Sequence, residues 1–257
     1  MIANYHTHTE RCHHAFGTDK EFVEAAYAAG IRELGFSDHV PYPETEDRPE
    51  NHYRVFKADI PGYFSSIAEL KREYSGRMKI YGGFESEYFP NAFDRNLEYL
   101  RDSGLEYLIL GQHFCDEYQT MGSFTETADE QELDRYVFSV IEGIRSGKFT
   151  YVAHPDVKNF VGDRRYYERR MLELCYAAAD RDIPLEFNLL GFAAKKHYPN
   201  DTFFGLASKI GNKVILGVDA HVPAFFDNAK LFADAKEHLA SLGITPIDRV
   251  DIVDPFR

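Results

Sequence analysis

Tryptophan is absent from the 257-residue chain, and its three cysteines are scattered at Cys12, Cys115 and Cys175. An odd and small number of cysteines excludes a disulfide framework, so we expect a reducing, cytoplasmic environment. Long apolar runs are missing too, because no stretch reaches the roughly 18 apolar residues that a membrane-spanning helix needs. The first residues also lack the basic-then-apolar pattern of a secretion signal. We therefore expect a protein that stays out of membranes.

Basic residues are scarce relative to acidic ones: 29 Lys and Arg stand against 42 Asp and Glu, for a net charge of −13. Such a surface repels phosphate backbones and anionic membranes, so we predict neither nucleic-acid nor membrane binding. A small phosphorylated substrate is still compatible, because a local cationic pocket or a metal cluster can override the global field. The hydrophobic content of 44% indicates a packed globular chain.

Short apolar runs alternate with longer amphipathic stretches along the whole chain. The apolar runs predict buried parallel strands over residues 2–6, 33–37, 78–84, 106–110, 149–153, 184–188 and 213–218. The stretches between them predict helices over residues 19–29, 62–74, 92–103, 127–147, 165–182, 202–210 and 225–241. Thr18 with Glu21, and Thr127 with Glu130, have the spacing of helix-capping boxes.

Seven strand-then-helix units without a break in composition predict one α/β domain over residues 1–257, either a barrel or an open doubly wound sheet. Two long loops, residues 40–54 and 115–129, follow the second and fourth predicted strands. Barrel enzymes keep lids and substrate contacts in loops at such positions.

Histidine is what the sequence has in plenty, with eleven residues, and their positions are informative. Five of the predicted strands end in histidine and a sixth ends in a glutamate. These residues are His6, His8, His39, Glu85, His113, His154 and His221. Because the carboxyl ends of parallel strands converge, the side chains should meet in space. Clustered imidazoles repel one another when protonated and waste hydrogen bonds when neutral, so the pattern predicts divalent metal ions between them.

The strand ends carry a series of short motifs. They read His6-Thr7-His8-Thr9, Ser37-Asp38-His39, Gly83-Phe84-Glu85, Gln112-His113, Ala153-His154-Pro155 and Gly217-Val218-Asp219-Ala220-His221. In this order they resemble the motifs of the PHP (polymerase and histidinol phosphatase) superfamily. Residues 12–15 (Cys-His-His-Ala) and 35–39 resemble its histidinol-phosphate phosphatase branch. The resemblance implies a distorted barrel of seven β/α units with a metal site at the carboxyl ends of the strands.

The resemblance also implies a trinuclear site. One ion would take His6, His8, Glu85 and Asp219; a second would share Glu85 and add His113 and His154; a third would take His14, His39 and His221. His13, next to His14, is the alternative for that position. Nitrogen and oxygen ligands without thiolates suit zinc, manganese or iron, so we expect two to three such divalent ions.

The activity that the resemblance implies is hydrolysis of L-histidinol phosphate to L-histidinol and phosphate, a step of histidine biosynthesis, by a metal-bridging hydroxide. We expect Asp219, or alternatively His221, to protonate the departing alkoxide.

Four residues outside the ligand set are candidate substrate contacts. Lys158, Arg164 and Arg165 follow His154 and could bind the phosphate, while Asn188 ends the sixth predicted strand. Phosphatases of this branch carry an arginine after the sixth-strand glycine. This chain has Phe-Ala-Ala-Lys-Lys at residues 192–196, where lysine could supply a point charge without the guanidinium fork.

Three other functions compete with this one. A PHP phosphoesterase could act on another small phosphate ester, a nucleotide or a phosphodiester, although the compact chain favours a monoester. An amidohydrolase-like barrel acting on C–N bonds would use a bridging lysine, and no lysine ends the fourth predicted strand. A non-catalytic PHP module would have lost ligands, whereas here all nine positions are filled.

Overall fold

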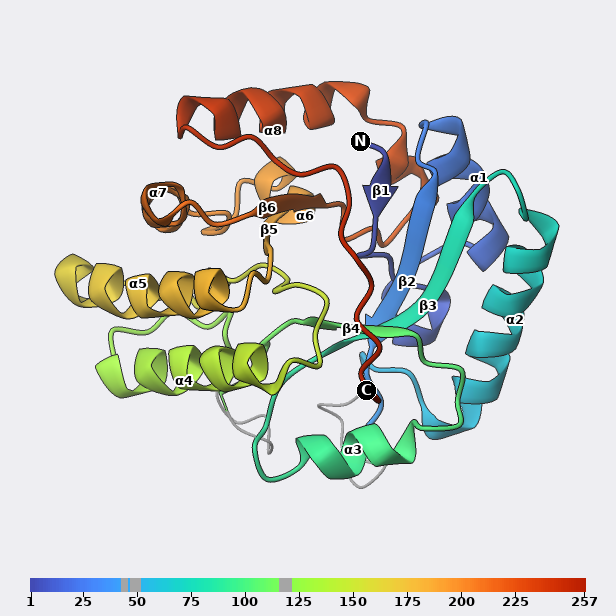
Figure 1. Cartoon of the computed structure of the whole chain (residues 1–257), viewed down its shortest axis with the longest axis horizontal. Helices are drawn as coiled ribbons and strands as arrows, with labels where there is room; N and C mark the ends of the chain where they lie inside the picture. Colours follow the sequence, from blue (N-terminus) through green and yellow to red (C-terminus); the bar gives the residue numbers. More distant parts are fainter. Residues whose placement is uncertain (43–45, 47–51, 116–121) are drawn as a thin grey trace.

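The structure, a computed structural model, describes the chain except for residues 43–45, 47–51 and 116–121, so parts of the two predicted long loops lie outside it. Its described strands pair in parallel in two groups (Figure 1). The first group has the order β1 (Ala3–Asn4), β2 (Glu33–His39), β3 (Lys79–Ser86) and β4 (Tyr107–Leu110). The second pairs β5 (Leu185–Asn188) with β6 (Val214–Gly217).

Single bridges join the two groups into a curled parallel sheet. Val152 bridges Leu110 of β4 and Leu185 of β5, and Thr7 bridges Ala220 beyond β6. The fifth predicted strand, residues 149–153, is therefore reduced to one bridging residue. The backbone turns immediately afterwards, because His154 has a φ of +28°. The predicted α/β fold with parallel strands is confirmed, in a distorted, incompletely hydrogen-bonded form.

Seven of the described helices match those predicted, and the short α6, directly after β5, was not predicted. The described α-helices are α1 (Asp19–Ala28), α2 (Ile60–Glu73), α3 (Phe93–Tyr99), α4 (Glu130–Ser146), α5 (Arg164–Asp180), α6 (Leu189–Ala193), α7 (Asp201–Ile210) and α8 (Ala229–Ser241). The capping box of Thr18 and Glu21 is present at α1. The box at Thr127 is not, because the Thr127 N–H donates to the Asn159 carbonyl (3.0 Å) and Asp129 caps α4 instead.

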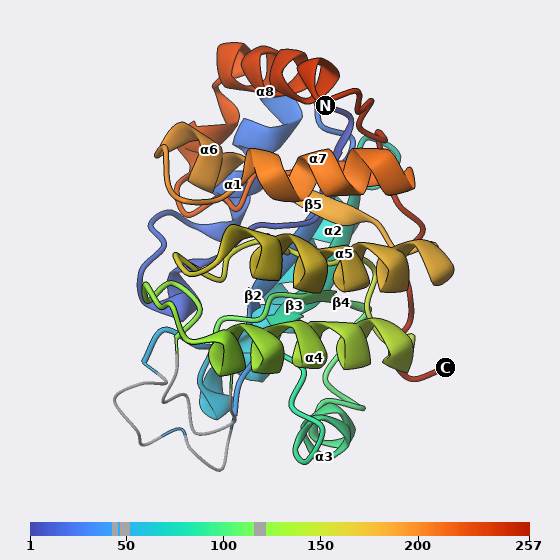
Figure 2. The same cartoon turned by 90° about the vertical axis from the view of Figure 1, so that its left-hand side faces the viewer.

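The helices form the outer layer of the molecule. Figure 2 shows α4, α5, α7 and α8 in successive rows on one side, and α2 covers another side in Figure 1. Apolar side chains fill the space between helices and strands, among them Phe36, Phe84 and Leu110, all fully buried. Among the described residues, no helix combines the length and apolar character needed to cross a membrane.

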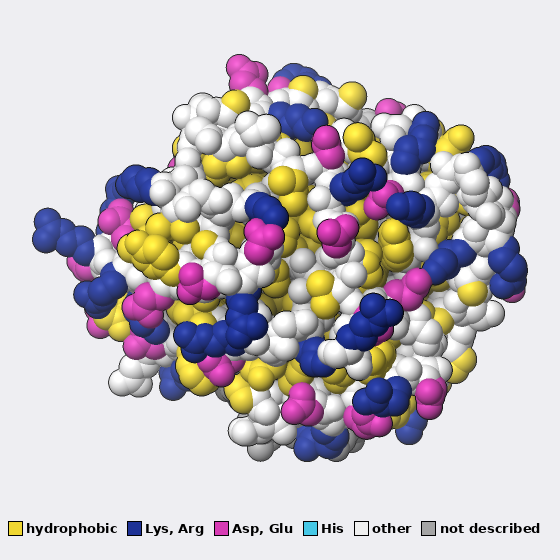
Figure 3. All heavy atoms as spheres, viewed as in Figure 1, with side chains coloured by type: hydrophobic (Ala, Val, Ile, Leu, Met, Phe, Trp, Pro, Cys, Tyr) yellow, Lys and Arg dark blue, Asp and Glu magenta, His cyan; other side chains and the backbone are white. Residues whose placement is uncertain are grey.

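A second apolar cluster fills the inside of the curled sheet and closes one end of it. It contains Tyr5, Tyr107 and Tyr151, and the C-terminal segment packs on it through Ile247 and Ile252. The Tyr107 ring crosses the interior so closely that a Cβ on Gly83 would collide with it. Around this C-terminal segment the surface intersperses acidic, basic and apolar side chains (Figure 3). The polar cluster described next lies at the opposite ends of the strands.

Candidate metal centre

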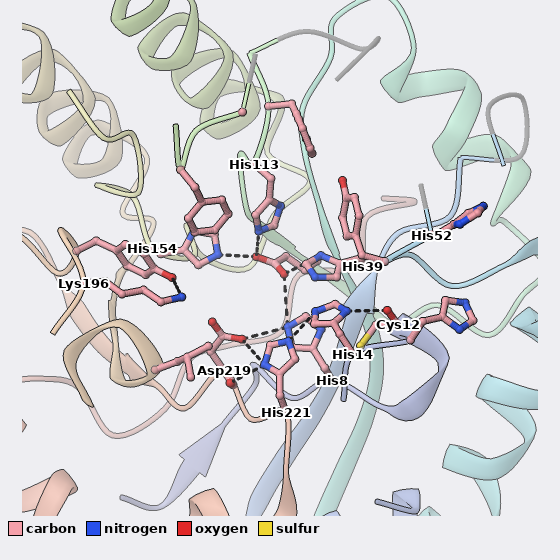
Figure 4. Close-up of a pocket in the computed structure, with 18 of the residues that line it drawn as sticks. His8, Cys12, His14, His39, His52, His113, His154, Lys196, Asp219 and His221 are labelled. Atoms are coloured by element: carbon pink, nitrogen blue, oxygen red, sulfur yellow. Dashed lines mark hydrogen bonds and ion pairs between the residues drawn. The ribbon is translucent and has the colours of Figure 1, made fainter. Parts of the chain in front are cut away.

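All nine predicted ligands come together at the carboxyl ends of the strands. These ligands come from six positions along the chain: after β1, at the end of β2, on β3, after β4, after the Val152 bridge and after β6. Eight of them line a cavity of about 770 Å³ (Figure 4). The eight are His8, His14, His39, Glu85, His113, His154, Asp219 and His221. The ninth, His6, is fully buried and contacts Glu85.

Glu85 is the centre of the cluster and is only 1% exposed. Its Oε1 atom lies 2.7 Å from His154 Nε2 and 3.2 Å from His113 Nε2. Its Oε2 atom lies 3.2 Å from His39 Nδ1 and 3.4 Å from His6 Nε2. Burial alone would raise the pKa of this carboxyl, but the imidazoles, His113 first, hold the pKa well below its ordinary value. Imidazole nitrogens thus lie close to both oxygens of Glu85, an arrangement that suits a carboxylate bridging two metal ions.

Asp219 is the second carboxylate of the cluster. Its Oδ1 atom lies 3.2 Å from His8 Nε2, 3.3 Å from His221 Nδ1 and 3.5 Å from His6 Nε2. Burial works against its charge, yet His6 and His8 keep the pKa of Asp219 well below the ordinary value. Burial and the neighbouring His8 lower the pKa of His221 to about 4. Both shifts favour the deprotonated forms, which are the forms that bind metal ions.

The three histidines predicted to hold a third ion, His14, His39 and His221, also lie together. His14 Nε2 lies 3.0 Å from His221 Nε2, and the His8 ring stacks on His221 with centroids 4.2 Å apart. The neighbouring His13 packs against Phe56, with ring centroids 4.4 Å apart. The Cys12 sulfur lies within 4.8 Å of ligand atoms of His14 and His221. The structure thus brings His14 into the group, and with it a thiol that the predicted ligand set lacks.

The buried polar atoms of the cluster show whether it fits metal ions. Within the described residues, six of them have no hydrogen-bond partner: His6 Nε2, His8 Nδ1 and Nε2, His39 Nδ1, Glu85 Oε2 and His154 Nδ1. Unsatisfied buried groups cost about 1–3 kcal/mol each. Donor atoms of His6, His8 and Glu85 lie within 4.8 Å of one another, as do those of His8, His39 and His221. This nitrogen and oxygen set fits divalent transition metals.

Three buried carboxylates behind the histidines were missed from the sequence. Glu186 lies 2.8 Å from His6 Nδ1 and accepts the His154 backbone N–H (2.9 Å). Asp38 lies 3.5 Å from His8 Nδ1, and Glu87 lies 3.2 Å from His113 Nδ1. Carboxylates that hydrogen-bond the imidazole, as Glu186 and Glu87 do here, fix the tautomer and orientation of metal-binding imidazoles. Glu87 carried a signal, because residues two apart on a strand share a face and Glu87 follows Glu85 by two.

Of the four predicted substrate contacts, Lys158, Arg164 and Arg165 lie away from the ligand cluster, and Asn188 is buried behind it. Lys158 is buried, and its Nζ atom donates to the Glu132 carboxylate (2.8 Å). Arg164 pairs with Glu168 on the exposed side of α5, and Arg165 beside it is exposed. Asn188 caps α6, and its amide donates to Glu186 (3.0 Å) and Asp219 (3.2 Å). None of the four is among the described residues that line the cavity.

Lys196 is the one lysine or arginine in the described lining of the cavity. Its Nζ atom lies 3.4 Å from the Tyr198 hydroxyl, above the Phe124 and Tyr198 rings (Figure 4). Tyr53 and Phe114 continue this aromatic wall. The cavity therefore joins a cluster of ligand atoms to one cation and an aromatic surface.

Comparison with known proteins gives matches over most of the chain. A family model described as PHP domain matches residues 4–189. A probable histidinol-phosphatase of Deinococcus radiodurans is 28% identical over 249 residues, covering 94% of each chain. The histidinol-phosphatase of Bacillus subtilis is 26% identical, covering 84% of this chain and 92% of its own.

Among solved structures, the histidinol phosphate phosphatase of Lactococcus lactis, complexed with zinc, L-histidinol and phosphate, has a similar fold. Its TM-score is 0.66 at 18% identity, over 91% of this chain and 93% of its own.

Proposed function

Because this chain belongs to the PHP domain family, we propose that it is a metal-dependent phosphomonoesterase that hydrolyses L-histidinol phosphate to L-histidinol and phosphate. The observation that carries the proposal is the set of buried, unpartnered nitrogen and oxygen atoms around Glu85 at the base of a cavity. Similarity to histidinol-phosphatases over nearly the full length supports the substrate and a place in histidine biosynthesis. We propose that residues 1–257 act as a single domain.

The ligand roles follow the three groups of the cluster. His6, His8, Glu85 and Asp219 would hold one ion; Glu85, His113 and His154 a second; and His14, His39 and His221 a third. Two to three divalent ions bound there would supply an activated water nucleophile and polarise a phosphoryl oxygen. Zinc, manganese and iron all suit these donor atoms.

Other residues of the cavity would bind and orient the substrate. Lys196 would contact the phosphate, because it is the one lysine or arginine among the described residues that line the cavity. Tyr198, Phe124 and Tyr53 offer aromatic faces to the organic part of a small ester. In addition to their ligand roles, Asp219, or alternatively His221, would protonate the departing alkoxide.

The test is a comparison of substrates with metal-reconstituted protein. We expect kcat/KM for histidinol phosphate to exceed that for glycerol phosphate or an aryl phosphate by at least ~100-fold, or about 2.7 kcal/mol. Remote groups of the true substrate should contribute binding energy at the reacting centre. Equal kcat/KM values across monoesters would indicate a general phosphatase. A preference for a nucleotide or diester would indicate another PHP phosphoesterase.

A further inference from the structure

We propose that Glu87 is a positioning residue for His113, and that Arg54 holds Glu87 in place. The inference rests on the proposed metal site and concerns residues outside its ligand set. The His113 ring lies between two carboxylates: its Nδ1 atom is 3.2 Å from Glu87 Oε1, and its Nε2 atom is 3.2 Å from Glu85 Oε1. A hydrogen on Nδ1 shared with Glu87 leaves the Nε2 lone pair directed at the ligand cluster.

Glu87 is held by more than His113. Arg54 Nη2 donates to Glu87 Oε1 (2.7 Å) and Arg54 Nη1 donates to Oε2 (3.0 Å), which makes a bidentate pair. The Tyr42 hydroxyl donates to Oε2 as well (2.8 Å). Arg54 and Glu87 are each only 1% exposed. Moving Glu87 would leave a buried guanidinium without its counter-charge, so the carboxylate is fixed on the side of His113 that faces away from the cluster.

Arg54 also connects this pair to the cavity wall. Its guanidinium carbon lies 4.3 Å from the ring centroid of Tyr42 and 4.6 Å from that of Tyr53. The Tyr53 ring lines the cavity and meets the His39 ring edge-on, with centroids 5.1 Å apart. The loop after β2 thus supplies a cation that fixes an imidazole after β4. The affinity for the ion beside His113 thus depends on Arg54 and Glu87, although neither belongs to the ligand set.

The experiment measures metal affinity on folded protein without substrate. Zinc or manganese is titrated against a competing chelator for the wild type and for the double variant Arg54→Met/Glu87→Met. Removing both charges together leaves no unpaired buried ion, and buried ion pairs often tolerate apolar replacement. We expect about one ion per chain to bind roughly 10–100-fold more weakly, the usual effect of losing such a partner, while the others keep their affinity. Glu87→Asp, which keeps the charge, should recover part of the loss.

Glu33→Gln is the matched control, because Glu33 is a buried carboxylate on β2 that accepts from Tyr5 (2.8 Å) and Lys79 (3.1 Å) at the other end of the sheet. It should leave every metal affinity unchanged. Wild-type affinity in the double variant would overturn the proposal, and so would an equal loss in Glu33→Gln or no recovery in Glu87→Asp. Because no substrate is used, a wild type that binds metal without hydrolysing the ester would overturn the proposed function alone.

Discussion

The two ends of the curled sheet bury polar groups in opposite ways. At the closed end, the Tyr107 hydroxyl donates to the Tyr5 and Phe36 carbonyls (2.8 and 3.0 Å), and the Tyr5 hydroxyl donates to Glu33 (2.8 Å). At the open end, six buried imidazole and carboxylate atoms have no hydrogen-bond partner in the described structure. The same strands build both ends. At the closed end the protein itself supplies the hydrogen bonds of its buried polar groups. At the open end the buried polar atoms need bound metal ions as partners.

The backbone separates the two ends less clearly than the side chains do. At the open end His154 and Asp219 have φ values of +28° and +53°, in a region that side chains other than glycine rarely adopt, but Asp182 before β5 also has a φ of +53°. Glycine fills tight positions at both ends, since a Cβ on Gly35 would collide with the Tyr107 hydroxyl and one on Gly111 with the Glu85 carboxylate. The unpartnered buried side-chain atoms are therefore what assigns function to the open end.

The largest effect should follow from removing the centre of the open end. Glu85→Ala takes away both oxygens around which His6, His39, His113 and His154 converge. We expect the loss of at least one metal ion per chain and a fall of phosphatase activity to background, measured by elemental analysis and phosphate release. A nearly wild-type rate in this variant would refute the bridging role of Glu85.

A smaller effect should follow from removing the cation of the cavity. Lys196→Ala should lower kcat/KM. The corresponding loss of transition-state stabilisation should be about 1.5–3 kcal/mol, the scale of a hydrogen bond to a charged group, with metal content unchanged. Arg164→Ala is the control, because Arg164 is exposed and pairs with Glu168 away from the cavity lining. If Arg164→Ala lowers kcat/KM and Lys196→Ala does not, the phosphate contact lies on α5, as the sequence predicted.

The smallest effect on function is expected at the closed end. Tyr107→Phe removes the donor to two buried carbonyls and should lower the free energy of unfolding by about 1–2 kcal/mol. Urea unfolding measures this loss, and metal content and kcat/KM should stay at the wild-type level. A loss of bound metal with little change in stability would contradict the division of roles between the two ends.

Much of the fold could be predicted because buried strands and amphipathic helices leave periodic patterns in the sequence. The fifth predicted strand is the exception. Residues 149–153 have the apolar pattern of a strand, but the turn at His154 limits pairing to Val152. The prediction of a capping box at Thr127 was wrong for a similar reason. The Thr127 backbone N–H donates to the distant Asn159 carbonyl, and this contact is not visible in the local Thr127–Glu130 spacing.

The ligand cluster could be predicted because strand order alone brings the carboxyl ends of parallel strands together. The predicted substrate contacts after His154 do not line the cavity, because closeness in sequence to His154 does not set the direction of a long side chain. Lys158 follows His154 by four residues, yet it is buried against Glu132 of α4. Glu186 was missed because it lies within β5, and the prediction considered only the strand end at Asn188.

The central claim is that the open end of the sheet is a metal centre, and metal content tests it most directly. Protein purified without chelators and reconstituted with zinc, manganese or iron should contain two to three ions per chain by elemental analysis, and Glu85→Ala should contain fewer. Less than one ion per chain, with no gain on reconstitution, would contradict the account.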